Sequence, residues 1–193
     1  MIVATNNKNK LNEIKKILTG YKIYSLKEKE IYLEIAEDQE TFLDNAKKKA
    51  IEVYKIAKEE VVADDSGLCI NCLDGFPGVM THRFLGENAT DRMRNEYLIN
   101  RVSKYIDRSA RVICSLSYYN GKNIVTCEGV LDGFIAKTPR GSNGFGFDEI
   151  FELPNGLTLA ELAPVEKKKL SARAIALKNL KEALQKWCRG EIF

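Results

Sequence analysis

The sequence predicts an α/β protein with a mixed β-sheet, and three observations lead to this prediction. Short apolar runs, typical of buried strands, alternate with segments of helical periodicity. Near the middle of the chain, two strand-like segments flank Asn120-Gly121, the strongest hairpin turn in the sequence. No internal repeat or linker-like stretch divides the 193 residues. We therefore expect helix-connected strands and hairpin strands to share one sheet.

The elements of the first half follow from their own apolar patterns. Gly20 is a stop signal for the first helix, and Thr41 is a good N-cap for the second. In chain order, we expect a strand over residues 2–4, a helix that ends at Gly20, a strand over 21–26, a short strand near 32–35, a helix over 42–57 and extended chain over 61–73.

The elements of the second half are predicted in the same way. Met93, Tyr97 and Val102 are expected on the inner side of a helix. In chain order, we expect a helix over 89–105, strands over 110–119 and 124–135, a Gly-rich loop over 138–147, a short strand over 147–151, a short helix over 158–163 and a long amphipathic helix over 171–188.

Composition and charge exclude several classes of protein. Hydrophobic residues make up 45% and charged residues 30%, as in ordinary globular chains. No apolar run approaches the roughly 20 residues that a membrane helix needs, and the chain turns polar after residue 4, so we expect a cytoplasmic protein. The formal charge of +3 is too small to indicate a nucleic-acid partner, and no stable nucleic-acid complex is expected.

The five cysteines are expected to be reduced and structural. Cys69 and Cys72 match the C-x-x-C pattern, but their segment has the pattern of a strand, where residues three apart face opposite sides. A zinc site would need a second pair, and the sequence has none. His82 is the only histidine, and we expect it to have a surface or structural role.

Two polar segments near the N-terminus could bind charged groups. Residues 5–10 join a strand to a helix N-terminus, where unpaired N–H groups favour anions. They could cradle a phosphate chain, although they lack the glycines of a Walker loop, and an Asn-rich N-cap turn is the equal alternative. The acidic residues of 37–40, taken alone, are better explained as a solvated turn.

Asp64 and Asp65 are the strongest catalytic candidates. Adjacent carboxylates at the end of an apolar strand are costly unless they bind a cation or are held apart. Mg²⁺ is normally held by a few carboxylates together with substrate phosphates. A carboxylate at this position can also take a proton from an attacking water.

A Gly-rich segment and a basic segment lie in the last third of the chain. In residues 141–148, three glycines flank two aromatic residues, so the backbone can approach a ligand and a ring can stack on a base. Asp148 could then contact an edge of that base, and a flexible hairpin loop is the alternative. The cations of 167–173 could meet a triphosphate, but a solvated helix start explains them better by themselves.

In this order, the segments resemble the inosine triphosphate pyrophosphatase family, and the similarity covers the whole chain. It rests on seven motifs, each weak alone: Ala4-Thr5-x-Asn7-x-x-Lys10-x-x-Glu13, Glu40-Thr41-Phe42-x-x-Asn45-Ala46-x-x-Lys49-Ala50, Ala63-Asp64-Asp65-Ser66-Gly67-Leu68, Gly75-x-Pro77-Gly78-Val79 with Arg83, Gly144-Phe145-Gly146-Phe147-Asp148-x-Ile150-Phe151, Thr158-x-Ala160-Glu161-Leu162, and Glu166-Lys167 with Ser171-x-Arg173.

The resemblance implies an elongated mixed sheet in a single two-lobed domain over residues 1–193, with an active cleft between the lobes, and a homodimer. It implies Mg²⁺-dependent hydrolysis of ITP, dITP or XTP to the monophosphate and pyrophosphate. Asp65 would be the catalytic base and a metal ligand, with Glu37 as the second ligand and Glu40 as the second choice. The substrate-binding residues would be Thr5, Asn6, Asn7, Lys8, Asn9, Lys10, Ser66, Phe145, Gly146, Phe147, Asp148, Lys167, Ala172 and Arg173.

Three departures from the family pattern bear on base selectivity. Ala172 stands where the family has a histidine that is expected near the 6-oxo group. Residues 147–149 are Phe-Asp-Glu and not Tyr-Asp-Pro, and residues 81–84 are Thr-His-Arg-Phe and not Ser-Ala-Arg-Tyr. His82 could partly replace the missing histidine. A related pyrophosphatase for other modified nucleotides, or a non-catalytic nucleotide- or RNA-binding module, are the alternative functions.

Overall fold

The structure, a computed structural model, describes residues 1–86 and 88–189 and divides them into two compact units. Unit 1 contains residues 1–66, 114–129 and the chain from 172 onward. Unit 2 contains residues 67–113 and 130–171. The prediction of one two-lobed domain over residues 1–193 stays a prediction.

The described strands form one mixed six-stranded sheet in the order β2-β1-β3-β4-β5-β6. Strand β1 (Ile2–Val3) pairs in parallel with β2 (Tyr24–Ser25) and with β3 (Val61–Ile70). The long hairpin strands are β4 (Ser109–Tyr119) and β5 (Ile124–Ile135), and β6 (Phe151–Glu152) pairs antiparallel to β5. The predicted α/β class with a mixed sheet is confirmed.

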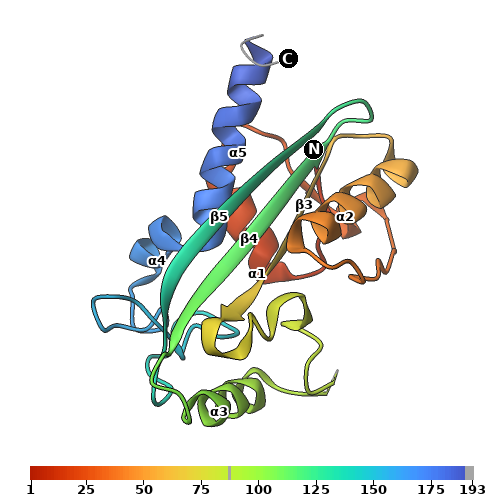
Figure 1. The fold of residues 1–193 in the computed structure, drawn as a ribbon. Coiled ribbons are helices and arrows are strands. Elements are labelled where there is room, and N and C mark those ends of the chain that lie inside the picture. Colours follow the sequence, from red (N-terminus) through yellow and green to blue (C-terminus); the bar gives the residue numbers. More distant parts are fainter. Residues whose placement is uncertain (87, 190–193) are drawn as a thin grey trace. The chain divides into compact units, whose positions relative to one another are not determined.

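Unit 1 contains the helices α1 (Lys8–Ile17), α2 (Phe42–Ala57) and α5 (Ala172–Cys188), and α1 contacts α5 (Figure 1). The Thr41 hydroxyl accepts from Asp44 N at 3.0 Å, so the predicted N-cap is confirmed. Apolar residues of β1, β3 and α2, among them Ile2, Val53 and Val61, form a buried cluster. One face of the sheet is thereby fixed against α2.

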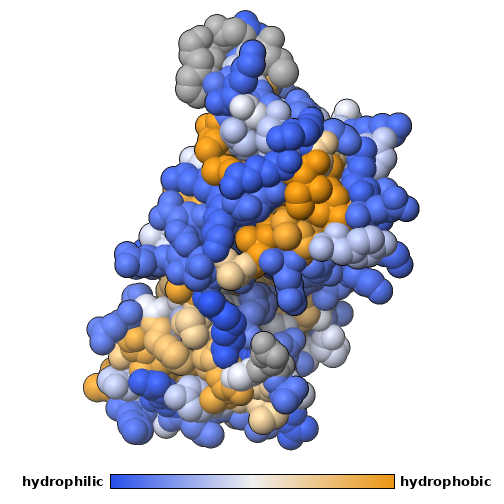
Figure 2. Space-filling model, turned by 90° about the vertical axis from the view of Figure 1, so that its right-hand side faces the viewer, coloured by the Kyte–Doolittle hydropathy of each residue, from blue (hydrophilic) through white to orange (hydrophobic). Residues whose placement is uncertain are grey.

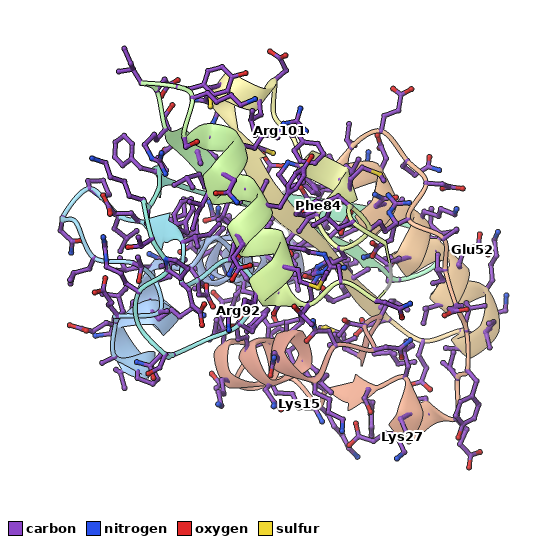
Figure 3. All side chains as sticks on the ribbon, turned by 90° about the horizontal axis from the view of Figure 1, so that it is seen from below. Lys15, Lys27, Glu52, Phe84, Arg92 and Arg101 are labelled. Carbon is purple, nitrogen blue, oxygen red and sulfur yellow. The ribbon has the colours of Figure 1, made fainter. Side chains whose placement is uncertain are left out.

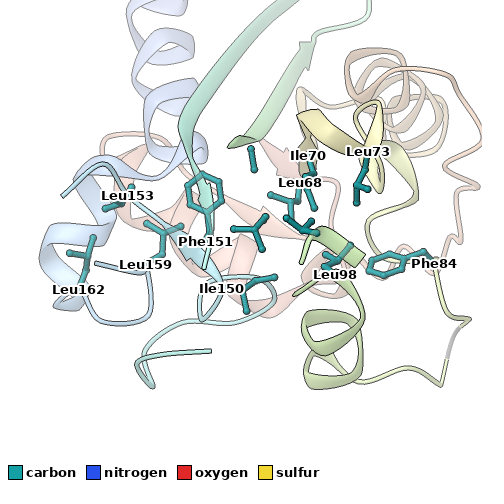
Figure 4. Packing of buried hydrophobic residues seen from close by; sticks show 13 residues of the cluster. Leu68, Ile70, Leu73, Phe84, Leu98, Ile150, Phe151, Leu153, Leu159 and Leu162 are labelled. Atoms are coloured by element: carbon teal, nitrogen blue, oxygen red, sulfur yellow. The ribbon is translucent and has the colours of Figure 1, made fainter. Parts of the chain in front are cut away.

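Unit 2 contains α3 (Asp91–Val102) and α4 (Pro164–Leu170), and Leu98 and Val102 of α3 belong to a second buried cluster. Figure 4 shows Leu68 and Ile70 of β3 lying between Phe151 and Phe84, with Leu98 of α3 close by. This cluster anchors both α3 and the segment that follows the Gly-rich loop.

Several predicted elements are wrong or misplaced. The strand over 21–26 is only Tyr24–Ser25, and residues 32–35 contain no strand. Residues 158–163 form turns, and the helix of this region lies at 164–170. The expected strand over 147–151 is mostly a turn that leads into β6. These short segments take their form from tertiary contacts, which outweigh weak local propensity.

The α3 prediction is correct in type but wrong in detail. The helix runs from 91 to 102 and not from 89 to 105, and Met93 is 52% exposed although an inward position was expected.

Among the described residues, no helix combines the length and the hydrophobicity that crossing a bilayer requires. Figure 2 shows one face of the molecule, where hydrophilic residues predominate and hydrophobic residues gather in separate areas.

Candidate active site

Strand β3 carries Asp64 and Asp65 side by side, and both are almost completely buried. Consecutive residues of a strand point to opposite faces, so the two carboxylates enter different surroundings. Each carboxylate has its own hydrogen-bond donors, all from unit 1. The electrostatic repulsion between the Asp64 and Asp65 carboxylates is therefore reduced, because the strand points them in opposite directions.

Asp64 is the centre of a buried ion cluster. Its Oδ2 atom lies 3.0 Å from Lys10 Nζ and accepts from Arg173 Nε at 3.2 Å and Nη2 at 3.1 Å. Its Oδ1 atom is buried and has no hydrogen-bond partner. Burial opposes the charged form most strongly, but Lys10 and Arg173 together hold the pKa of Asp64 below its usual range. Asp64 is therefore a buried anion that orients two cations.

Arg173 also bonds a second residue of α1 and a second residue of β3. Its Nη1 atom donates to Glu13 Oε2 of α1 at 2.6 Å, and its Nη2 atom also donates to Ser66 Oγ at 3.0 Å. Four of the five N–H donors of the guanidinium are thus engaged by the protein. Burial disfavours the Arg173 cation, yet the nearby Asp64 and Glu13 carboxylates raise its pKa. At most one donor is left for a substrate in this arrangement.

Asp65 has a different environment. Its Oδ2 atom accepts from Asn45 Nδ2 at 2.9 Å, and its Oδ1 atom accepts from Ser66 N at 2.9 Å. Burial raises the pKa of Asp65 and the Glu37 carboxylate adds to the rise, while the Lys49 ammonium opposes it. A carboxylate with a raised pKa and two fixed oxygens is suited to accept a proton from water.

Lys49 lies between Asp65 and Glu37. Its Nζ atom donates to Glu37 Oε1 at 2.8 Å and lies 3.7 Å from Asp65 Oδ1. The ammonium therefore bridges the two carboxylates that were predicted as metal ligands. Glu40 is exposed, so the structure brings Glu37 rather than Glu40 into the neighbourhood of Asp65.

The Glu37–Asp65 pair fits a magnesium ion. Within residues 1–86 and 88–189, no group of three or more His, Cys, Asp or Glu side chains could hold a metal. Mg²⁺ usually keeps several waters and takes only one or two carboxylates together with substrate phosphates, so a pair of hard oxygen ligands is sufficient. The ammonium that bridges the pair shows that this position favours a cation.

The structure adds Asn45, Lys49 and Glu13 to the predicted site residues. Asn45 and Lys49 are four residues apart on α2, and both are buried although α2 is otherwise apolar on that face. In the sequence, these two residues could have been recognised as polar positions at helical spacing within an otherwise apolar stripe. Glu13 gave no such signal, because its partner Arg173 is 160 residues away.

Residues 5–10 use part of their polar groups within the protein. The Asn7 carboxamide oxygen caps α1, accepting from Asn9 N at 2.9 Å and Lys10 N at 3.2 Å, and Asn7 N donates to Thr5 Oγ1 at 3.2 Å. The N-cap interpretation is therefore correct for Asn7. Asn6, Lys8 and Asn9 are exposed, whereas Lys10 turns inward to Asp64.

In unit 2, Asp148 organises the Gly-rich loop. Its Oδ2 atom accepts from Phe145 N at 2.7 Å and pairs with Lys167 Nζ, which also lies 5.2 Å from the centre of the Phe145 ring. Gly144 has a φ of +97°, and a Cβ there would overlap Asp148 Oδ2. The structure thus brings together the predicted residues Phe145, Asp148 and Lys167, and the loop is anchored by specific contacts.

The rings of Phe84 and Phe147 stack, with centroids 6.2 Å apart and an interplanar angle of 19°. Figure 3 shows Phe84 beside α3, on which Arg92 and Arg101 are labelled.

His82 is exposed, as expected, and its carbonyl oxygen accepts from Arg94 Nη2 at 3.0 Å. Cys69 and Cys72 are partly buried and form no disulfide with each other.

Comparisons with known proteins identify the family of the chain. The model of the Ham1 family matches residues 1–183. A dITP/XTP pyrophosphatase of Clostridium tetani is 38% identical over 97% of this chain and 96% of its own length, and that of Bacillus subtilis is 42% identical over 95% and 96%. The solved structure of a HAM1 protein from Coxiella burnetii is 37% identical, with a TM-score of 0.89 over 96% of this chain and 98% of that one.

Proposed function

Since the chain belongs to the Ham1 family, we propose that it hydrolyses non-standard purine nucleoside triphosphates (ITP, dITP and XTP) to the monophosphate and pyrophosphate. Relatives named dITP/XTP pyrophosphatase support this substrate class. The structural observation that carries the proposal is Asp65, a buried carboxylate whose oxygens accept from Asn45 Nδ2 and Ser66 N and lie close to Lys49.

Asp65 is the general base of the proposed reaction. Asn45 and the Ser66 N–H group fix its two oxygens, so the carboxylate keeps one orientation while it accepts the proton of the attacking water. Lys49 lies 3.7 Å from Asp65 Oδ1, and the charge of Lys10 also acts on Asp65. Phosphoryl transfer depends mainly on positioning and on charge stabilisation.

Glu37 and Asp65 would hold the Mg²⁺ ion. When bound, Mg²⁺ supplies positive charge against the triphosphate. Residues 5–10 supply further contacts to the phosphates through the exposed Asn6, Lys8 and Asn9. Arg173 contributes mainly by holding Asp64 and Ser66, because most of its donors already have protein acceptors.

We assign recognition of the purine base to the loop of residues 145–148. The Phe145 ring offers a stacking surface, and the Asp148–Lys167 pair supplies polar groups of both signs for a base edge. Ala172 lacks the imidazole of the family pattern, which favours testing other modified nucleotides as substrates. A homodimer in the cytoplasm completes the proposal.

The test is pyrophosphate release from ITP, XTP and ATP by the purified protein with Mg²⁺. We expect pyrophosphate and not single phosphate, with ITP and XTP preferred over ATP. Asp65→Asn should lower kcat by about 100-fold or more while the far-UV spectrum is unchanged. Asp38→Asn is the matched control, because Asp38 is an exposed acid that pairs with Lys48. A fully active Asp65→Asn protein excludes Asp65 as the base.

A further inference from the structure

Helix α3 holds one residue of the Gly-rich loop by both of its backbone groups. Asp91 Oδ2 accepts from Gly146 N at 2.8 Å, and Asn95 Nδ2 donates to Gly146 O at 3.1 Å. Asp91 and Asn95 are four residues apart, so they lie on one face of the helix. We call this arrangement the α3 clamp. All its residues belong to unit 2.

The α3 clamp fixes the two peptide planes on either side of Gly146. The Gly146 N–H belongs to the plane shared with Phe145, and the Gly146 C=O belongs to the plane shared with Phe147. Since each peptide group is rigid, holding both planes restricts the positions from which the two aromatic rings project. Gly146 itself has a φ of +65°, in the left-handed region where glycine is least strained.

Asn95 carries a cost that its packing does not require. The residue is 2% exposed, and its Oδ1 atom is buried without a hydrogen-bond partner. Burying an amide with half of its polar atoms unsatisfied is unfavourable, and an apolar residue of similar size would avoid this cost. The hydrogen bond from Asn95 Nδ2 to the Gly146 carbonyl is what this residue provides at that cost.

Other anchors of the loop act at different points. Asp148 holds the Phe145 N–H, and Phe84 stacks on Phe147. Neither of these contacts fixes the Gly146 peptide planes. A further bond, from Asp148 N to Phe145 O at 3.4 Å, reaches the plane shared with Phe145. The α3 clamp differs from it by holding both Gly146 planes from one helix.

We propose that Asp91 and Asn95 are specificity-determining positioning residues, which set base selectivity by fixing the Gly146 peptide planes. The inference rests on the proposed function, in which the loop contacts the base. Discrimination between bases depends on the exact placement of a few groups, and small misplacements weaken it strongly. Loss of the clamp should therefore reduce selectivity and raise KM more than it lowers kcat.

The test compares three variants of α3. Asp91→Ala removes the acceptor, Asp91→Asn retains an acceptor oxygen but removes the charge, and Glu96→Ala removes an exposed acid that pairs only with Arg92 among the contacts described for it. We expect Asp91→Ala to lower the ratio of kcat/KM for ITP over ATP by about tenfold, mainly through KM. Asp91→Asn should restore most of the ratio, and Glu96→Ala should leave it unchanged.

Amide hydrogen exchange of Gly146 provides a readout that does not depend on turnover. Exchange should accelerate in Asp91→Ala and stay at the wild-type rate in Glu96→Ala. Asp91 is exposed, so its variants are expected to fold, and Asn95→Ser is added only if its thermal unfolding is cooperative. An Asp91→Ala protein whose ITP-to-ATP ratio stays within about twofold of wild type overturns the proposal.

Failure of the proposed function gives a different result. A wild-type protein that releases no pyrophosphate from ITP or XTP contradicts the activity itself. The clamp is then judged by IMP binding in calorimetry: weaker binding to Asp91→Ala than to Glu96→Ala supports it, and equal binding overturns it.

Discussion

Replacing Arg173 with methionine should destabilise unit 1 strongly. The change removes the donors of Nε and Nη2 from Asp64, whose Oδ1 atom already has no partner. Breaking one side of a buried ion pair costs about 3–5 kcal/mol. Since Lys10 Nζ stays 3.0 Å from Asp64, we expect about 3 kcal/mol.

Urea unfolding measures this loss. With a slope of about 2–3 kcal/mol/M, the midpoint should fall by about 1 M or slightly more. The single tryptophan, Trp187, lies on α5 in unit 1 and packs on Tyr118 with ring centroids 5.9 Å apart, so its fluorescence reports on the affected unit. The matched control is Lys178→Met, which removes a surface cation of the same helix.

The double variant Arg173→Met/Asp64→Asn separates charge from packing. Removing the charge of the unpaired carboxylate should recover about half of the lost stability, because a neutral amide is cheaper to bury than an anion. An Arg173→Met protein within about 1 kcal/mol of wild type would refute the reasoning. So would a double variant that is no more stable than the single one.

Three further predictions concern local features. Lys10 and Arg173 hold the pKa of Asp64 in the folded protein below the usual 3.8, so the ionised Asp64 stabilises the fold fully above pH 3.8. This stabilisation is lost as the pH falls through the lower pKa of the folded state. Asp64→Asn should therefore weaken the loss of stability at acid pH, as measured by Trp fluorescence. Gly144→Ala should raise KM for ITP about tenfold with a smaller change in kcat, because its Cβ would overlap Asp148. Gly121→Ala should lower Tm more than Gly20→Ala: both glycines have positive φ, but only Gly121 lies against Tyr54.

Long, strongly patterned elements could be predicted from the sequence. Residues 110–119 alternate apolar and polar positions, and the hairpin with its Asn120-Gly121 turn is present as β4 and β5. The segments near 32–35 and 158–163 could not be predicted, because they are short. Leu33 and Ile35 pack against the buried cluster of unit 1, and residues of 158–163 bond other segments of the chain. One example is Thr158, whose hydroxyl donates to the Arg140 carbonyl.

The candidate site was predicted only in part. Asp65 and Glu37 were expected in one site, and the structure brings both to Lys49. Asn45 and Glu13 lie in the motifs of the sequence, but no site role was predicted for them; their partners Asp65 and Arg173 are 20 and 160 residues away. Arg173 was expected to contact substrate, but its donors mostly meet protein carboxylates, which no local pattern encodes.

The sequence by itself determined the α/β class, the order of the chemical motifs and the family, because periodicity and motif spacing are local properties of the chain. Only the tertiary structure decided which charges meet. Asp64 and Asp65 are neighbours in the sequence, yet one is held by Lys10 and Arg173 and the other by Asn45 and Lys49. The physical reason is the alternation of a strand, which turns adjacent carboxylates to opposite faces and gives them opposite pKa shifts.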